Sequence, residues 1–139
     1  LLAMQKVVSS NLITRSIFLP LSDSRLKLFR CALALATCVF LTLALRPGMS
    51  QPVDSLPHMD KLEHFGAFVL FAFLAQGAFP KLPTWVKIGV LAAIGLGVEL
   101  GQMAVPHRHF SVGDLLANCA GIGVFFAARG WRKQISGEK

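Results

Sequence analysis

The fold class is first indicated by the run WVKIGVLAAIGLGVELGQMAV, which covers residues 85–105 and ends at Pro106. A helix that crosses a bilayer needs ~17–25 mostly apolar residues, so this stretch is long enough. Three similar apolar runs cover residues 28–45, 64–79 and 114–128. The last two are short unless their polar first turns belong to the helix. The sequence therefore predicts an all-α integral membrane protein, a bundle of four helices.

The overall composition agrees with a membrane protein. Hydrophobic residues make up 54% of the 139-residue chain and charged residues 15%, whereas about a quarter of the residues in soluble domains are charged. Intrinsic disorder is excluded, since a disordered chain has few apolar residues. A soluble globule of this size has too much surface to hide so much apolar area, which disfavours that class as well.

The positive charges are distributed as they are in a membrane protein. The chain has 14 Lys and Arg against 7 Asp and Glu, and the positive residues lie mainly between the apolar runs. They do not share one face, which disfavours nucleic-acid binding. If four helices alternate in direction, 11 of the 14 fall on one side of the membrane and 3 on the other. Because positive residues collect in cytoplasmic loops, both termini are predicted to be cytoplasmic.

The first apolar run is expected to remain in the protein as a membrane helix. A cleaved signal peptide is the alternative, but the basic leader before the run is long and no small-x-small site follows Leu45. The chain then divides into an N-terminal cytoplasmic segment (1–27), a four-helix transmembrane domain (28–128) and a basic cytoplasmic tail (129–139).

The cysteines carry no predicted chemistry. Cys31, Cys38 and Cys119 lie within apolar runs, their number is odd and no C-x-x-C occurs. Neither a disulfide framework nor a structural zinc site is therefore indicated. We interpret the three as small residues of the core.

Polar residues collect at the helix ends that are predicted to lie on the outer side. Ionisable groups in a membrane span usually face the bundle interior or water, and Glu99 is the sharpest example. Residues three or four positions apart share one helix face. That spacing groups Asp60, Lys61 and His64 in the second run, Glu99 and Gln102 in the third, and Asp114 and Asn118 in the fourth. With Arg108 these residues form the predicted site. Asp114 also suits a helix N-terminus, with Ser111 just upstream.

Small residues form two stripes at four-residue spacing, which lets helices approach closely in lipid. The stripe of the third run is Gly89, Ala93, Gly97 and Gly101, and that of the fourth is Gly113, Ala117 and Gly121. Glu99 lies about 200° around the helix from the first stripe, so the third helix is expected to make contacts on two faces and to be central. Gln76, in the middle of the second run, is predicted to form an interhelical hydrogen bond.

Several of these residues occur in an order that resembles the signature of a known family. The elements are Asp60-Lys61-x-x-His64-Phe65, Glu99-x-x-Gln102, Arg108 and Asp114-x-x-x-Asn118-x-x-Gly121. The ordered set resembles the VanZ-like family of small bacterial membrane proteins, over roughly half the chain (57–128). The resemblance implies a four-span fold, in the bacterial inner membrane, and a link to low-level teicoplanin resistance. His107, His109 and the N-terminal stretch are not explained by it.

The carboxylates of the predicted site have three interpretations. Asp60, Glu99 and Asp114 can pair with the nearby cations and hold three helices together. They can instead bind a ligand or headgroup, or act with His64 as acids and bases. The guanidinium of Arg108 suits a phosphate or carboxylate, which in a membrane means a lipid headgroup or a lipid-linked envelope precursor.

No metal site and no cofactor are predicted from the spacing. The His107-Arg108-His109 triplet has metal-capable side chains, but neither H-x-x-x-H nor H-E-x-x-H occurs in the chain. A Walker loop, a dinucleotide fingerprint and G-x-S-x-G are also missing from the sequence.

Three functions are compatible with these observations. The preferred hypothesis is an outer-facing polar pocket that binds an anionic lipid headgroup or lipid-linked envelope precursor and influences teicoplanin susceptibility. One alternative is a membrane enzyme that uses Glu99, Asp60 or His64 as acid or base on a lipid-linked substrate. The other is a non-catalytic scaffold or assembly protein. The expected partners are membrane lipids or lipid-linked precursors, and not nucleic acid.

Overall fold

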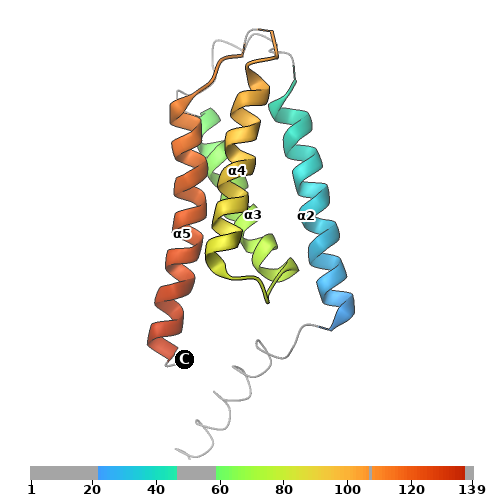
Figure 1. Ribbon diagram of the computed structural model, residues 1–139, viewed down its shortest axis with the longest axis vertical. Coiled ribbons are helices and arrows are strands. Elements are labelled where there is room, and N and C mark those ends of the chain that lie inside the picture. Colours follow the sequence, from blue (N-terminus) through green and yellow to red (C-terminus); the bar gives the residue numbers. More distant parts are fainter. Residues whose placement is uncertain (1–21, 47–58, 107, 137–139) are drawn as a thin grey trace, which may run out of the picture.

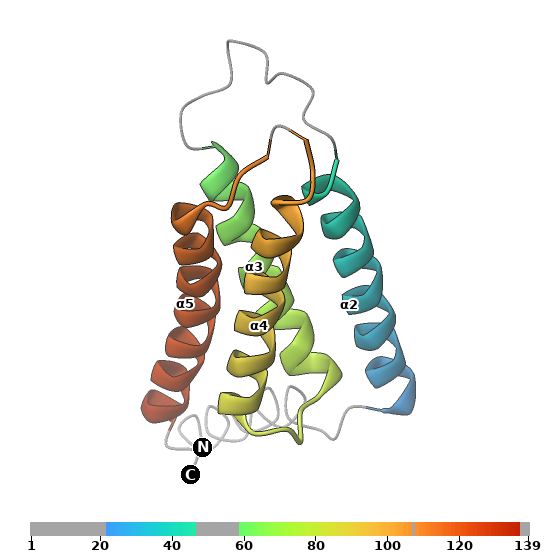
Figure 2. The ribbon, with the colours of Figure 1, turned by 45° about the horizontal axis from the view of Figure 1, so that its top comes forward.

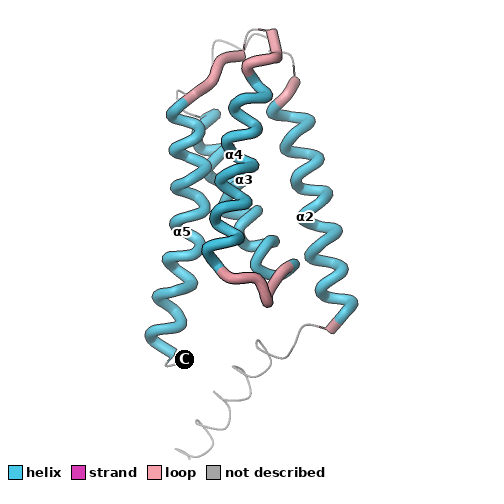
Figure 3. The backbone as a smooth tube through the Cα atoms, in the orientation of Figure 1, coloured by secondary structure: helices cyan, strands magenta, loops and turns pink. Residues whose placement is uncertain are grey.

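The computed structural model describes residues 22–46, 59–106 and 108–136. This part of the chain contains four helices and loops, and no strand (Figure 3). The helices are α2 (Asp23–Ala44), α3 (Met59–Ala78), α4 (Thr84–Gln102) and α5 (Val112–Ser136). They run alternately up and down (Figure 1), which confirms the predicted all-α bundle. Most of the expected N-terminal segment lies outside the described residues.

The helices start and stop at other residues than the apolar runs. α3 begins at Met59, so the polar turn before the apolar run belongs to the helix and gives it 20 residues. α5 continues through the basic tail to Ser136. α4 stops at Gln102, because Met103, Ala104 and Val105 form three tight turn bonds to the carbonyls three residues before them.

Three of the four helices are long and apolar enough to cross a membrane: α2, α4 and α5. The helix outside this group is α3, whose first two turns carry Asp60, Lys61 and Glu63. Large apolar side chains remain exposed along the bundle. Examples are Leu35, in the middle of α2, and Leu100, near the end of α4. So many exposed apolar side chains on helices of this length suit acyl chains and not water. The protein is a membrane protein.

The most extensive helix–helix contact joins α3 to α5, and the next joins α2 to α3. α4 also contacts all three other helices, but less extensively. The expectation that the helix of residues 85–105 is the centre of the bundle is therefore wrong. The helix with the largest share of the contacts is α3, because it carries the large side chains that fill the interior.

The core lies between these helices and is rich in phenylalanine. Its buried members are Phe68, Phe71, Ala72, Ala75, Leu91, Ile122 and Phe126. Phe40 of α2 meets the rings of Phe68 and Phe71 edge-on, with ring centroids 5.9 and 5.4 Å apart. Such edge-to-face pairs add stabilisation beyond the burial of apolar area.

The two stripes of small residues have different surroundings. A Cβ atom on Gly121 would lie 2.5 Å from the carbonyl oxygen of Phe65, so α5 approaches the backbone of α3 directly at this glycine. The stripe of the fourth run therefore packs as predicted. On α4, a Cβ atom on Gly89 or Gly97 would meet nothing within 4 Å, and Ala93 is exposed. Contrary to expectation, this part of the α4 stripe contacts no other described helix.

A polar contact joins α3 to α4 near the end of α3 and the start of α4. The ammonium group of the buried Lys87 on α4 donates a 2.6 Å hydrogen bond to Oε1 of Gln76 on α3 and one of 3.3 Å to the carbonyl of Phe79. The interhelical bond predicted for Gln76 is confirmed.

The three cysteines are not core residues. Cys31, Cys38 and Cys119 are all exposed on the outside of their helices, with free thiols. Our interpretation of them as buried small residues is wrong, because an apolar run in a membrane bundle has a lipid-facing side as well as a core side.

Candidate functional site

The predicted site lies at the end of the bundle where α3 and α5 begin and α4 ends (Figure 2). Polar side chains are concentrated and buried there: His64, Glu99, Gln102, Asp114 and Asn118 each have 4% or less of their surface exposed. We call Asp60, Lys61, His64, Glu99, Ser111, Asp114 and Asn118 the polar cluster. It joins three helices and the loop between α4 and α5.

Ser111 connects two carboxylates in this cluster. Its backbone N–H donates a 3.1 Å hydrogen bond to Oε2 of Glu99, which lies at the end of α4. Its hydroxyl oxygen accepts a 3.2 Å bond from the backbone N–H of Asp114, in the first turn of α5. This second bond is a helix N-cap, as the sequence indicates. Ser111 thus fixes the start of α5 against the end of α4.

The imidazole of His64 is held by two oxygens on the same side of its ring. Its Nδ1 lies 3.0 Å from Oδ1 of Asn118 and 3.7 Å from Oε1 of Glu99. Because both neighbours are acceptors, the ring proton belongs on Nδ1, which donates to Asn118. In the neutral ring Nε2 then carries a free lone pair. Phe40 packs edge-on against the ring, with 5.5 Å between the centroids, and fixes its orientation.

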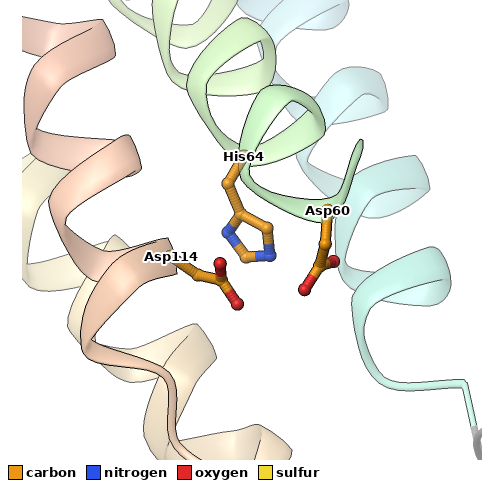
Figure 4. Close-up of side chains that lie close together, drawn as sticks. All are labelled: Asp60, His64 and Asp114. Atoms are coloured by element: carbon orange, nitrogen blue, oxygen red, sulfur yellow. The ribbon is translucent and has the colours of Figure 1, made fainter. Parts of the chain in front are cut away.

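Two further carboxylates lie close to this ring. Figure 4 shows the imidazole of His64 with the carboxylates of Asp60 and Asp114 close to it. One side-chain ligand atom from each of the three residues lies within 4.8 Å of the others. Lys61 is the cation beside them, with its ammonium nitrogen 3.6 Å from Oδ1 of Asp114. Its side chain is 45% exposed, so water screens this ion pair.

Gln102 and Arg108 lie outside the polar cluster but at the same end of the bundle. The amide nitrogen of Gln102 donates a 3.2 Å hydrogen bond to the carbonyl of Ala44, at the end of α2. Arg108 is half-buried in the loop before α5 and interacts electrostatically with Asp60. Within the described part of the chain, its guanidinium forms no hydrogen bond. His107 lies outside the described residues.

Three buried polar atoms of the cluster have no hydrogen-bond partner among the described residues. They are Oε1 of Glu99, Oδ1 of Asp114 and Nδ2 of Asn118. Most buried polar atoms in proteins are hydrogen-bonded, so three in one small region need an explanation. An unpaired buried group costs free energy, and in native proteins it is accounted for by stored strain, by a functional role or by a bound water or ion.

Sequence spacing predicts most members of this site but not how they meet. Glu99, His64, Asp114 and Asn118 come together as expected from their positions on helix faces. The link from Ser111 to Glu99, and the contacts of α2 through Phe40 and Ala44, were not expected. They join elements far apart in the chain, and periodicity within one helix gives no information on such pairs.

The chain matches one known family. A family model described as VanZ/LLP1 matches residues 8–129, which is most of the chain. The match extends well before the motif residues and includes α2. No curated protein and no solved structure matches the chain significantly.

Proposed function

Because this chain belongs to the VanZ/LLP1 family, we propose that it binds an anionic lipid headgroup or lipid-linked envelope precursor and influences teicoplanin susceptibility. The observation that carries the proposal is the half-buried guanidinium of Arg108, which has no hydrogen-bond partner within the described residues and lies at the same end as the polar cluster. A planar guanidinium in this state fits a phosphate or carboxylate with two parallel bonds.

Two of the three carboxylates of the cluster are withdrawn from the surface of this site. Glu99 is fully buried and accepts a bond from Ser111, and Asp114 is buried beside Lys61. Lys61 and Arg108 are less buried than these two carboxylates. An anionic headgroup arriving from the membrane surface therefore meets the two cations and the exposed Asp60, a net positive charge, before it meets the two buried carboxyl groups.

We place the protein in the bacterial inner membrane with this site on the outer side. Positive residues at the opposite end of the bundle support the orientation: Arg25, Lys27, Arg30, Lys81, Lys87, Arg129, Arg132 and Lys133. The site end has Arg46, Lys61 and Arg108. Because positive residues are retained on the cytoplasmic side, the end with eight is cytoplasmic.

Cysteine labelling tests this orientation. The exposed thiols of Cys31, Cys38 and Cys119 are first replaced by alanine, and Arg46→Cys or Lys81→Cys is introduced into that background. With a membrane-impermeant maleimide on intact spheroplasts, we expect labelling of Arg46→Cys. Lys81→Cys should react only after the membrane is opened. The reverse pattern would place the polar cluster on the cytoplasmic side.

Two substitutions test the binding proposal itself. Arg108→Ala removes the guanidinium, and Glu99→Gln removes a buried carboxyl group while keeping the shape of the side chain. If the chain raises the teicoplanin concentration needed to inhibit a sensitive host, each variant should return that concentration to the value of the empty vector. Lipids that co-purify with the wild type, identified by mass spectrometry, should be lost from Arg108→Ala.

Matched controls separate binding from folding. Arg46→Ala and Glu63→Gln remove exposed charges from the same end and should behave as wild type. An immunoblot of membranes shows whether each variant is inserted in normal amounts. If Arg108→Ala and Glu99→Gln keep both the phenotype and the lipids, the binding proposal is wrong. If they only lower the amount of protein, the cluster serves assembly.

A membrane enzyme is the second candidate, because the imidazole of His64 lies between carboxylates that can tune it as a base. A bell-shaped dependence of rate on pH with a lipid-linked substrate, in reconstituted vesicles, would support it. The absence of turnover over a panel of envelope lipids would count against it.

A further inference from the structure

Asp60, His64 and Asp114 together have the donor atoms of a metal site. Two come from α3 and one from α5, and one ligand atom of each lies within 4.8 Å of the others (Figure 4). Spacing within the sequence does not reveal this set, because Asp114 is 50 residues from His64. We propose that the three residues bind one divalent transition-metal ion of the Zn²⁺ type. This proposal does not depend on the lipid-binding function.

The state of His64 is that of a metal ligand. Its Nδ1–H donates to Asn118, and Glu99 also lies near Nδ1, which leaves the Nε2 lone pair free. Figure 4 shows the ring between the carboxylates of Asp60 and Asp114. Histidines that bind metals nearly always donate their other ring N–H to an oxygen in this way. Glu99 and Asn118 have no exposed surface, so this support is rigid.

An independent sign of a missing partner comes from Asp114. Its side chain is 5% exposed, and Oδ1 forms no hydrogen bond within the described residues. The nearest cation, Nζ of Lys61, is 3.6 Å away and belongs to a side chain that is 45% exposed. Lys61 can therefore move into water when a metal ion takes its place beside Asp114.

The three ligand atoms, which lie within 4.8 Å of one another, must move closer together to hold the ion. Donor atoms bonded to Zn²⁺ at ~2.0–2.1 Å lie about 3.4 Å apart around a tetrahedron. Without the ion the two carboxyl groups interact through charge repulsion and through a side-chain hydrogen bond that needs a proton on one of them, and a bound cation replaces both interactions. Asp60 is exposed at the first turn of α3, so its side chain is free to move inward.

The ligand set favours a transition metal over Ca²⁺ or Mg²⁺. Those ions prefer oxygen ligands, whereas one imidazole with two carboxylates suits Zn²⁺ and its neighbours. Three protein ligands also leave a fourth position open, which is the arrangement of metal sites that bind water or a further ligand.

Zinc titration of the purified protein tests the site. The full chain, without a polyhistidine tag and in detergent, is stripped with EDTA and titrated with ZnCl₂ alone by calorimetry. One ion per chain is expected to bind. Asp60→Asn and His64→Gln should weaken binding by about 10- to 100-fold or more, since even supporting residues have effects of that size.

The controls distinguish a metal site from a structural cluster. Glu63→Gln and His109→Gln remove the same groups from exposed positions nearby and should bind zinc as the wild type does. Lys61→Met removes the competing cation and should tighten binding, whereas a purely structural ion pair predicts only lost stability. Alanine at all three cysteines should leave the zinc affinity unchanged.

Two results would overturn the proposal: no stoichiometric zinc binding by the wild type, or equal affinity in wild type, Asp60→Asn and His64→Gln. Circular dichroism confirms that each variant is folded. Asp60 is exposed, so Asp60→Asn keeps the test decisive even where a buried substitution fails to fold.

Discussion

Gly121→Ala is expected to destabilise the bundle by about 1–3 kcal/mol, the usual cost of overpacking. The new Cβ atom would lie 2.5 Å from the carbonyl oxygen of Phe65 and 3.1 Å from the backbone nitrogen of Val69. Both are backbone atoms of α3, so no flexible side chain can give way. α3 and α5, which make the most extensive helix contact of the described chain, would have to separate.

Gly123→Ala is the matched control on the same helix. A Cβ atom there meets nothing within 4 Å, so the substitution should be neutral or stabilise α5 by about 0.5–1 kcal/mol through reduced backbone freedom. Thermal unfolding of the two variants in detergent, followed by circular dichroism, measures the difference. Equal unfolding temperatures would show that α5 does not approach the backbone of α3 closely at Gly121.

Asn118→Ala is expected to have the second large effect. The amide oxygen of Asn118 accepts the 3.0 Å hydrogen bond from Nδ1 of His64, and the side chain is fully buried. Its removal leaves the imidazole N–H without its acceptor, which costs about 1–3 kcal/mol for a buried polar group. A ring that is no longer fixed should also bind zinc about 10- to 100-fold more weakly.

Cys119→Ala, an exposed neighbour on α5, provides the control for stability and for zinc affinity. Both quantities are measured on the same preparations, by unfolding and by calorimetry. If Asn118→Ala unfolds at the wild-type temperature, the bond to His64 contributes nothing to the fold. If it loses stability but keeps the zinc affinity, the orientation of the ring is unimportant for the metal.

The four helices can be predicted from the sequence because the lengths of the apolar runs match a bilayer. Their ends are less predictable. Polar residues at a membrane surface are compatible with helix or loop, so hydropathy does not show that α3 starts at Met59 or that α5 reaches Ser136. The hydrogen bonds of Ser111, which come from another element, determine where α5 begins against α4.

The membership of the polar cluster can also be predicted, since ionisable groups in apolar helices turn to the interior. The pairing within it cannot. Gln102 shares a helix face with Glu99, yet it bonds to Ala44 of α2. Gln102 therefore contacts α2, whereas Glu99 contacts Ser111 and α3. Two residues three positions apart on one helix can face different neighbouring helices.

The centre of the bundle is the clearest failure of the sequence pattern. Small residues allow close approach, but they do not supply a neighbour, and Gly89 and Gly97 of α4 face no other described helix. The large rings of α3, Phe68 and Phe71, fill the space between the helices instead. The volume of the side chains that fill the interior determines which helix becomes central. The spacing of small residues gives no information on that volume.

The charged first two turns of α3 have a consequence for biogenesis. Of the four described helices, α3 is the one outside the group that is long and apolar enough to cross a membrane, and it has the most extensive contacts with its neighbours. Ionisable groups within a membrane segment are costly unless they face the interior of a bundle or water, so the charged turns of α3 need the other helices around them. A nascent chain that stops before α4 should therefore leave α3 at the membrane surface, and its completion should draw α3 in as a hairpin.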